Sequence, residues 1–206
     1  MRIKSTNKRE KNIELVNING HTIAPEKLGD GVIIDVGCRG FYFCTNEIFK
    51  GRKIYAIDID SEALQDAPIG VETLNLGIWD SEGEVTYYRN GEGTCVKEVW
   101  EPHKDKYATA KTITIDQLYG ITGTNVDLLK LDCEGAEYHI LNEHFKPIPK
   151  QISVEFHYHC VPAVHNQHID RILKMLEKDY EAVNLVWEQK HGAGFNFWDT
   201  LFVRKW

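Results

Sequence analysis

The chain has 206 residues, of which 42% are apolar and 27% are charged, and its net charge is −7. This length and composition allow one sizeable apolar core, are too short for two ordinary domains, and exclude a disordered or fibrous chain. The apolar runs are too short to span a bilayer, and the negative charge argues against nucleic acid as a partner.

The first residues are basic but are not followed by the apolar stretch of a secretory signal, so we expect an intracellular protein. An odd number of cysteines without a C-x-x-C pair is typical of reduced thiols. Cys133 lies between Asp132 and Glu134, whose negative charges disfavour a thiolate, and we interpret it as a packing residue. We therefore expect a cytoplasmic protein without a membrane partner.

The N-terminal segment 12–23 alternates loosely and contains Asn19-Gly20, a strong signal for a hairpin turn. We predict a small β extension over residues 1–30 that carries no obvious chemistry. From Gly31 onward, apolar strands alternate with helix-like segments, which predicts βαβ units and a parallel sheet. Residues 31–206 are therefore expected to form the core of a single α/β domain.

Two early strands end in residues suited to binding a ligand. The strand at 31–36 runs into Gly37, and a glycine there permits a tight turn and a close approach of the backbone to a ligand. The strand at 53–58 ends in Asp58, 21 residues after Gly37, where a carboxylate accepts hydrogen bonds from both ribose hydroxyls of an adenosine-containing cofactor. Asp60 is the alternative if the strand register differs. The spacing also suits a nicotinamide dinucleotide, but no G-x-G-x-x-G follows the first strand.

The remaining elements follow from apolar periodicity and turn residues. The clearest is a helix near the C-terminus, where apolar residues within 169–176 recur at helical spacing and should face the core. The polar segment 89–111 shows little periodicity, and we predict a long loop that acts as a mobile acceptor-binding lid bearing Trp100 and Tyr107. The other predicted elements are helices at 42–49, 61–66, 135–145 and 165–180, strands at 71–76 and 84–88, and antiparallel closing strands at 182–187 and 197–203.

The most informative segment is 126–137, with the sequence V-D-L-L-K-L-D-C-E-G-A-E. An apolar run there ends in three carboxylates, Asp132, Glu134 and Glu137, where a strand gives way to a helix. Ligands bind at the carboxyl ends of strands in open α/β sheets, so these acids indicate a functional site. The next strand carries Glu155 and His157, and parallel pairing would bring them to the same edge of the sheet.

These segments together resemble the FkbM family of S-adenosylmethionine-dependent methyltransferases over residues 31–204. The similarity lies in the glycine turn after the first strand, the D-x-E-G-x-E motif within 129–137, S-V-E-F-H at 153–157 and the closing strand at 200–204. One departure is Phe41, because the family usually has a second glycine there and this chain has Gly40 one place earlier. The resemblance implies a Rossmann-like class I methyltransferase sheet, mostly parallel with antiparallel closing strands and helices on both faces, and S-adenosylmethionine as the cofactor.

The resemblance also implies a set of cofactor-binding residues. Asp35 is expected near the cationic end of the cofactor, because a buried acid is costly unless it meets a cation or several donors. Gly77 and Ile78 resemble the segment that lines the adenine side, although Ile78 also fits a plain core, and for Trp79 we expect core. The implied residues are Asp35, Gly37, Cys38, Gly40, Phe41, Asp58, Ile59, Gly77, Ile78 and Asp132.

The candidate catalytic residues are Asp132, Glu134, Glu155 and His157, because an acceptor must approach past the ends of the fourth and fifth strands. Methyl transfer to a hydroxyl is a direct displacement, in which alignment supplies much of the acceleration and a base is useful. We expect His157 to be the leading base, because the ordinary pKa of histidine suits that role near neutral pH. Glu155 is equally well interpreted as a structural partner of Lys130 in the neighbouring strand.

Several alternatives stay open. His157 and His159, with Asp132 and Glu134, offer nitrogen and oxygen ligands for a divalent ion, but their spacing is not diagnostic, so no metal is assigned. The resemblance implies O-methylation of a small molecule, sugar or glycan. The rival functions are a nicotinamide-dependent oxidoreductase and a non-catalytic cofactor-binding module.

Overall fold

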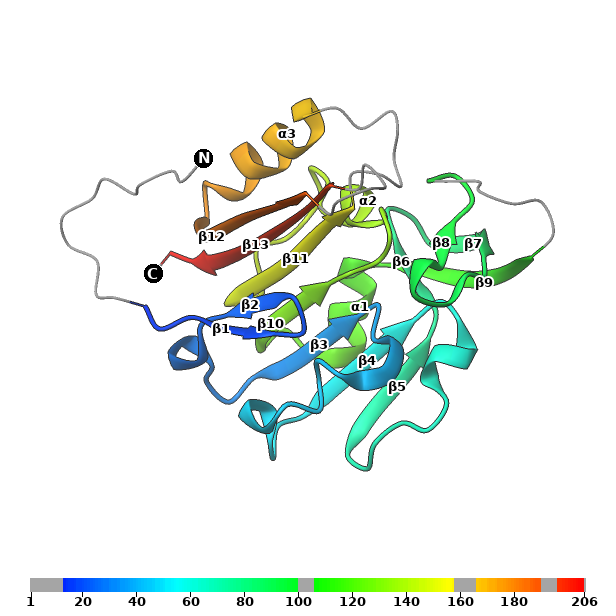
Figure 1. The fold of residues 1–206 in the computed structure, drawn as a ribbon, viewed down its shortest axis with the longest axis horizontal. Coiled ribbons are helices and arrows are strands. Elements are labelled where there is room, and N and C mark those ends of the chain that lie inside the picture. Colours follow the sequence, from blue (N-terminus) through cyan, green and yellow to red (C-terminus); the bar gives the residue numbers. More distant parts are fainter. Residues whose placement is uncertain (1–12, 100–105, 158–165, 190–195, 206) are drawn as a thin grey trace.

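The computed structural model describes residues 13–99, 106–157, 166–189 and 196–205, and its main feature is a seven-stranded sheet (Figure 1). The strands are β3 (Val32–Val36), β4 (Ile54–Asp58), β5 (Val71–Asn75), β10 (Val126–Leu131), β11 (Gln151–His157), β12 (Tyr180–Gln189) and β13 (Asn196–Arg204). Their order is β12-β13-β11-β10-β3-β4-β5, in which β13 is antiparallel to both β11 and β12 and the other neighbouring strands pair in parallel. The predicted, mostly parallel sheet with antiparallel closing strands is confirmed.

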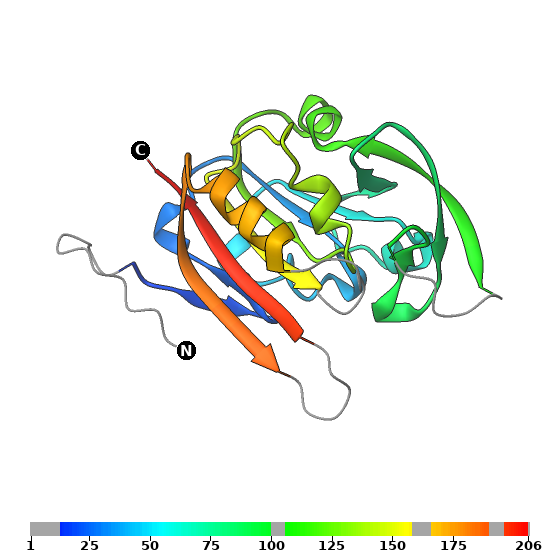
Figure 2. The ribbon, with the colours of Figure 1, turned by 90° about the horizontal axis from the view of Figure 1, so that it is seen from above.

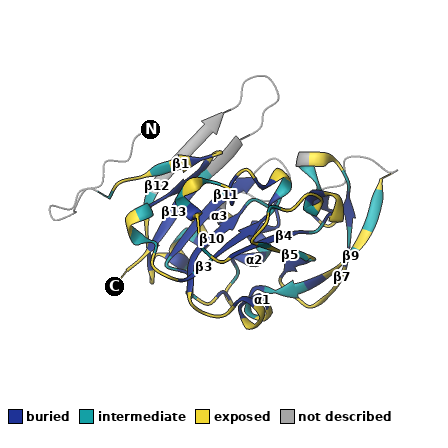
Figure 3. Cartoon of the chain, turned by 90° about the horizontal axis from the view of Figure 1, so that it is seen from below, coloured by how far each residue is buried: buried dark blue, intermediate teal, exposed yellow. Residues whose placement is uncertain are grey.

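Both faces of this sheet are covered (Figure 2). On one face, α1 (Ile115–Thr122), α2 (Glu137–Ile140) and α3 (Asn166–Leu176) pack with β3, β10 and β11 in the larger apolar core. On the other face lie the short 3-10 helices η2 (Arg39–Phe41) and η3 (Glu47–Phe49) and the strands β1 (Val16–Ile18) and β2 (His21–Ile23). The central strands are consequently buried along nearly their whole length, whereas the edge strand β5 is largely exposed (Figure 3).

The N-terminal hairpin forms as predicted. Asn19 and Gly20 have φ angles of 49° and 92°, and a type I′ turn requires positive φ at both central residues. Ile18 therefore pairs with His21, and β2 packs against β11 and β13 (Figure 1). This packing buries the His21 side chain on the sheet.

Segment 89–111 is not the long loop that the sequence predicted. It contains the 3-10 helix η5 (Gly91–Gly93), the strand β8 (Cys95–Val96) and the first five of the eight residues of β9 (Tyr107–Thr114). With β6 (Gly77–Trp79) and β7 (Gly83–Tyr88), these strands form a four-stranded sheet of order β6-β9-β7-β8. The prediction failed because β9 is half-exposed and rich in threonine and alanine, so its apolar alternation is weak. Trp100 lies outside the described residues.

The prediction of a helix at 42–49 is also wrong, because the chain forms the two short helices η2 and η3 with a break between them. Phe41 has a φ of 56°, and Asn46 starts η3 separately by accepting a hydrogen bond from the backbone N–H of Ile48. The helix expected at 61–66 is η4 (Ser61–Leu64), whose N-cap is Asp60.

The two later helices are shorter than predicted. The helix expected at 135–145 is reduced to the single turn of α2, which leaves helical geometry at Leu141. α3 ends at Leu176, and its residues Ile169, Ile172 and Leu176 are buried as predicted. No helix among the described residues combines the length and apolar composition needed to cross a membrane.

Candidate active site

A cavity of about 500 Å³ lies at the carboxyl ends of β3, β4, β10 and β11. The wall opposite the sheet is formed by β6 and by Gly91, Thr94 and Val96 of the segment expected to be a lid. Asp35, Cys38 and Phe41 are buried but do not line the cavity. The predicted residues that line it are Gly37, Gly40, Asp58, Ile59, Gly77, Ile78, Asp132, Glu134, Glu155 and His157.

The turn after β3 depends on Gly37. Its φ is 77°, and a Cβ atom at this position would lie 1.7 Å from the carbonyl oxygen of Asp132. Only glycine therefore allows the turn and the end of β10 to meet. Gly40 and Phe41 follow with φ angles of 75° and 56°, and the Phe41 ring packs in the apolar core with Cys38. Gly40, one place earlier than the usual family glycine, thus still allows a tight turn. The side chains of Cys38 and Phe41 are buried, so any contact of these residues with a cofactor would be through the backbone.

Asp58 ends β4 with its side chain at the cavity, and its carboxylate accepts a hydrogen bond of 2.9 Å from the backbone N–H of Asp60. Burial raises the pKa of the Asp58 carboxyl to about 6. The alternative, Asp60, does not line the cavity, because it is paired with Arg39 at 2.9 Å and with Arg89 at 3.4 Å. Of these two acids, Asp58 is therefore the one that a ligand in the cavity can contact.

Lys130 does not pair with Glu155, and that prediction is wrong. The ammonium of Lys130 lies 3.1 Å from Asp35 and 3.3 Å from Asp132, and it donates to the carbonyl of Gly37 at 2.6 Å. Lys130 is level with Asp35 of β3 and with Ser153 of β11, so the register brings Asp35, not Glu155, to its side. Asp35 therefore meets the lysine behind the cavity and has no direct contact with the cavity itself.

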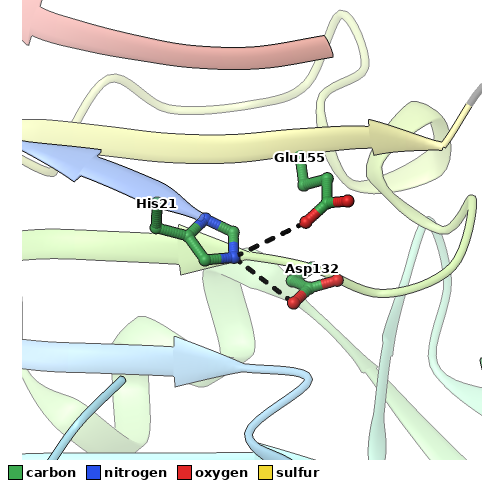
Figure 4. A group of neighbouring side chains, drawn as sticks. All are labelled: His21, Asp132 and Glu155. Carbon is green, nitrogen blue, oxygen red and sulfur yellow. Dashed lines mark hydrogen bonds and ion pairs between the residues drawn. The ribbon is translucent and has the colours of Figure 1, made fainter. Parts of the chain in front are cut away.

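Glu155 and Asp132 instead share a buried histidine that the sequence did not single out, His21 of β2 (Figure 4). Its Nε2 lies 3.3 Å from Asp132 Oδ2 and 4.0 Å from Glu155 Oε2. Burial lowers the pKa of His21, although its hydrogen bond to Asp132 opposes this effect. The sequence signal that could have identified His21 was its position directly after the Asn19-Gly20 turn, because a hairpin can pack against a neighbouring sheet.

His157 faces the same carboxylates from the other side. Its Nε2 lies 3.5 Å from Asp132, 3.6 Å from Glu134 and 3.8 Å from Glu155. Its Nδ1 lies 3.1 Å from the fully buried Glu137. Burial acts to lower the pKa of His157, but Glu137 and the other carboxylates outweigh this effect and raise that pKa well above its ordinary value. The imidazolium form is therefore favoured, so the ordinary pKa on which the expectation of a base rested does not apply to His157, and its catalytic role stays a prediction.

The carboxylates themselves have different environments. Burial, reinforced by Asp132, raises the pKa of Glu155 to about 7. Burial also acts on Asp132, but Lys130 and His21 hold the pKa of that carboxyl below its ordinary value. Burial and Glu137 raise the pKa of the Cys133 thiol, which agrees with a packing role.

The D-x-E-G-x-E motif separates into two roles. Glu134 and Gly135 have φ angles of 51° and 100°, and this turn lets Glu137 accept hydrogen bonds from the backbone N–H groups of Cys133 at 2.6 Å and Gly135 at 2.9 Å. Glu137 thus fixes the loop and holds His157, while Asp132 and Glu134 face the cavity.

The far wall includes Ile78 and Trp79 of β6. A Cβ atom on Gly77 would lie 3.1 Å from Thr112 and 3.2 Å from Ile59, so the glycine allows β6 to approach Ile59 closely. Trp79 belongs to the core, as predicted, and also borders the cavity. Its ring stacks on the ring of His139, with 3.9 Å between the ring centroids. His159 lies outside the described residues.

A cavity at the carboxyl ends of parallel strands, with a glycine turn after the first strand and an acid ending the second, defines an α/β enzyme of the class I methyltransferase type. The family is identified by sequence: the family description "Methyltransferase FkbM domain" matches residues 36–182, so the chain belongs to the FkbM methyltransferases. It is an S-adenosylmethionine-dependent methyltransferase, and the prediction of this cofactor is confirmed. His21 lies outside the matched residues.

A solved structure with a TM-score above 0.5 supports the fold. The fibrillarin/Nop5p complex is 13% identical, with 85% of this chain and 73% of that chain covered and a TM-score of 0.51. TrmK of M. capricolum, in complex with S-adenosylhomocysteine, is 11% identical, with 88% of this chain and 66% of that chain covered and a TM-score of 0.46. A TehB-like S-adenosylmethionine-dependent methyltransferase from Corynebacterium glutamicum is 13% identical, with 85% and 81% covered and a TM-score of 0.40. No curated protein matches the sequence significantly.

Proposed function

We propose that the protein transfers the methyl group of S-adenosylmethionine to a hydroxyl group of a small molecule, sugar or glycan. The observation that carries this proposal is the composition of one cavity, which is lined by Gly37 and Asp58 at the ends of β3 and β4 and by Asp132, Glu134 and Glu155 at the ends of β10 and β11. Asp58 is suited to bind the ribose hydroxyls, and the carboxylates offer acceptors for the hydroxyl hydrogens of a polyol.

The charge of the cavity favours the same acceptor class. Asp132, Glu134 and Glu155 would repel phosphate groups, so we propose a neutral, hydroxyl-rich acceptor rather than a nucleic acid. Methyl transfer is an in-line displacement, and these side chains would align the acceptor oxygen with the methyl carbon and the sulfur. We assign His157 to holding the carboxylates in place, since its imidazolium lies within 3.5 to 3.8 Å of all three.

The cellular setting is part of this proposal. Cys38, Cys44, Cys95 and Cys133 carry no disulfide among the described residues. Free thiols are typical of reducing compartments, so we propose that the enzyme acts in the cytoplasm.

The test combines ligand binding with turnover. Calorimetry should detect binding of S-adenosylhomocysteine and no binding of NAD. A panel of hydroxylated sugars and small metabolites, assayed with S-adenosylmethionine for release of S-adenosylhomocysteine, should then reveal an acceptor. Methyl transfer to amine or thiol acceptors but to none of the hydroxylated ones would contradict the proposed acceptor class.

Replacing Asp58 with alanine is expected to weaken S-adenosylhomocysteine binding strongly. Each charge-assisted hydrogen bond from a ribose hydroxyl contributes about 1.5 to 3 kcal/mol, so losing even one should raise Kd roughly 10-fold to 150-fold. Calorimetry measures the change. Glu72→Gln, which alters an exposed carboxylate on β5, should bind like the wild type. An unchanged Kd for Asp58→Ala would remove Asp58 from the cofactor site.

The same interaction predicts a pH dependence. The folded-state pKa of Asp58 is about 6, and only the ionised carboxylate accepts both hydroxyl hydrogen bonds strongly. Affinity for S-adenosylhomocysteine should therefore be full above this pH and fall as the pH drops below it. Asp58→Asn cannot titrate at this position and should lose that part of the dependence. Identical pH profiles for the wild type and Asp58→Asn would contradict the assignment.

A further inference from the structure

The cluster in Figure 4 has the geometry of a metal-binding site. His21, Asp132 and Glu155 come from three separate segments, and their ligand atoms lie within 4.8 Å of one another. His21 Nε2 is 3.3 Å from Asp132 Oδ2 and 4.0 Å from Glu155 Oε2. Two ligands about 2.1 Å from one ion are roughly 3 to 4 Å apart at ordinary coordination angles, so these distances fit a single ion.

The donor set also fits a transition metal. One imidazole nitrogen and two carboxylates are ligands that Mn²⁺ and neighbouring divalent ions accept in proteins. The other ring nitrogen of His21, Nδ1, lies 3.5 Å from Ser153 Oγ, so a hydroxyl orients the ring from behind, as in many histidine ligands of metals. The imidazole is buried with 1% exposure and points at the two carboxylates.

One side of the cluster is open. Asp132 and Glu155 line the cavity with exposures of 30% and 19%, whereas His21 does not reach it. An ion bound by these three side chains would have further coordination positions that face the cavity and are not occupied by protein ligands. Open positions distinguish metal sites that bind substrates from purely structural ones.

The surrounding charge is compatible with a bound cation. Lys130 lies 3.3 Å from Asp132, but Asp35 at 3.1 Å offsets its charge. Among the described residues, the ion-pair partners of Glu155 are the two imidazoles of His21 and His157. Neither lysine nor arginine pairs with Glu155 in this part of the chain, and the imidazolium of His157 lies 3.8 Å from Oε1, so Oε2 can accept an added ion.

We propose that His21, Asp132 and Glu155 bind one divalent transition-metal ion, for which Mn²⁺ is the probe. The ion would hold the oxygen of the acceptor hydroxyl at the edge of the cavity. That role rests on the proposed function, whereas metal binding itself rests only on the geometry of the three side chains. The hairpin at residues 16–23 then supplies a ligand from outside the family-matched region.

The test uses the full chain after treatment with EDTA and exchange into metal-free buffer. MnCl₂ is titrated while EPR follows the signal of free Mn²⁺. The wild type should bind one ion per chain. His21→Gln and Glu155→Gln should each weaken binding by about tenfold or more, because each removes one ligand. His144→Gln, which replaces an exposed histidine after α2, should bind like the wild type.

Controls separate this proposal from its alternatives. Urea unfolding shows that each variant is folded, and Glu155→Gln preserves the side-chain shape if His21→Gln does not fold. A wild type that leaves millimolar Mn²⁺ free would overturn the proposal, as would unchanged binding in both variants. Loss of binding in Glu134→Gln and His157→Gln, but not in His21→Gln, would also overturn it and move the ion to the neighbouring set of Asp132, Glu134 and His157. Absence of methyl transfer to every hydroxylated acceptor, with Mn²⁺ binding intact, would count against the proposed function alone.

Discussion

Replacing Lys130 with methionine is expected to lower the free energy of unfolding by about 3 to 5 kcal/mol, because it leaves a buried carboxylate without its cation. Lys130 is 3% exposed and the Asp35 side chain is 1% exposed, and their charged groups are 3.1 Å apart. Lys130 is the cation paired with Asp35 among the described residues, so the lysine is the main compensation for this charge. Urea unfolding at neutral pH measures the loss.

Two comparisons make this result specific to the buried pair. Lys50→Met breaks an ion pair with Glu47 whose side chains are 78% and 83% exposed, and it should change stability little. The double variant Asp35→Asn/Lys130→Met removes both charges and should be less destabilised than the sum of the single variants. A loss for Lys130→Met no larger than that for Lys50→Met would contradict the assignment of Lys130 to Asp35.

Replacing Gly37 with alanine is expected to destabilise the fold and weaken cofactor binding together. The alanine Cβ would lie 1.7 Å from the Asp132 carbonyl oxygen, a backbone atom that cannot move aside without displacing the end of β10. The left-handed conformation costs an alanine about 1 to 2 kcal/mol, and overpacking adds roughly 1 to 3 kcal/mol or more. The displaced turn is also the part of the backbone that lines the cavity beside Asp58.

Gly51 provides a matched control for this variant. Its φ is also +77°, but a Cβ atom there would have no neighbour within 4 Å. Gly51→Ala should therefore show the conformational cost alone and keep normal affinity for S-adenosylhomocysteine. Urea unfolding and calorimetry on both variants give the comparison. Equal losses of stability at the two positions would mean that the contact between Gly37 and Asp132 contributes nothing.

The sequence by itself determined the features whose signals are local. Asn19-Gly20 specifies its own turn through positive φ, and the apolar runs of β3, β4, β10 and β11 specify strands buried on both faces. The glycine after β3, the acid ending β4 and the acids after β10 follow from chain position relative to those strands. The cofactor class followed from these motifs and their resemblance to one family.

Only the tertiary structure decided which of these groups meet. Asp35, rather than Glu155, pairs with Lys130 because strand register sets side-chain neighbours, and register depends on how whole strands align. His21 reaches Asp132 from 111 residues away because the hairpin packs on the sheet. The second sheet likewise depends on pairing β9 with β6 and β7, since its half-exposed sequence has little pattern of its own.

The protonation of the site was decided in the same way. The sequence identifies His157 as a histidine at a strand end, and from that alone its ordinary pKa favours a base. In the folded chain, Glu137 contacts Nδ1 while Asp132, Glu134 and Glu155 surround Nε2, and these carboxylates stabilise the imidazolium. A pKa reports the energy of a charge in its full environment, and that environment is assembled from segments that are distant in the chain and adjacent only after folding.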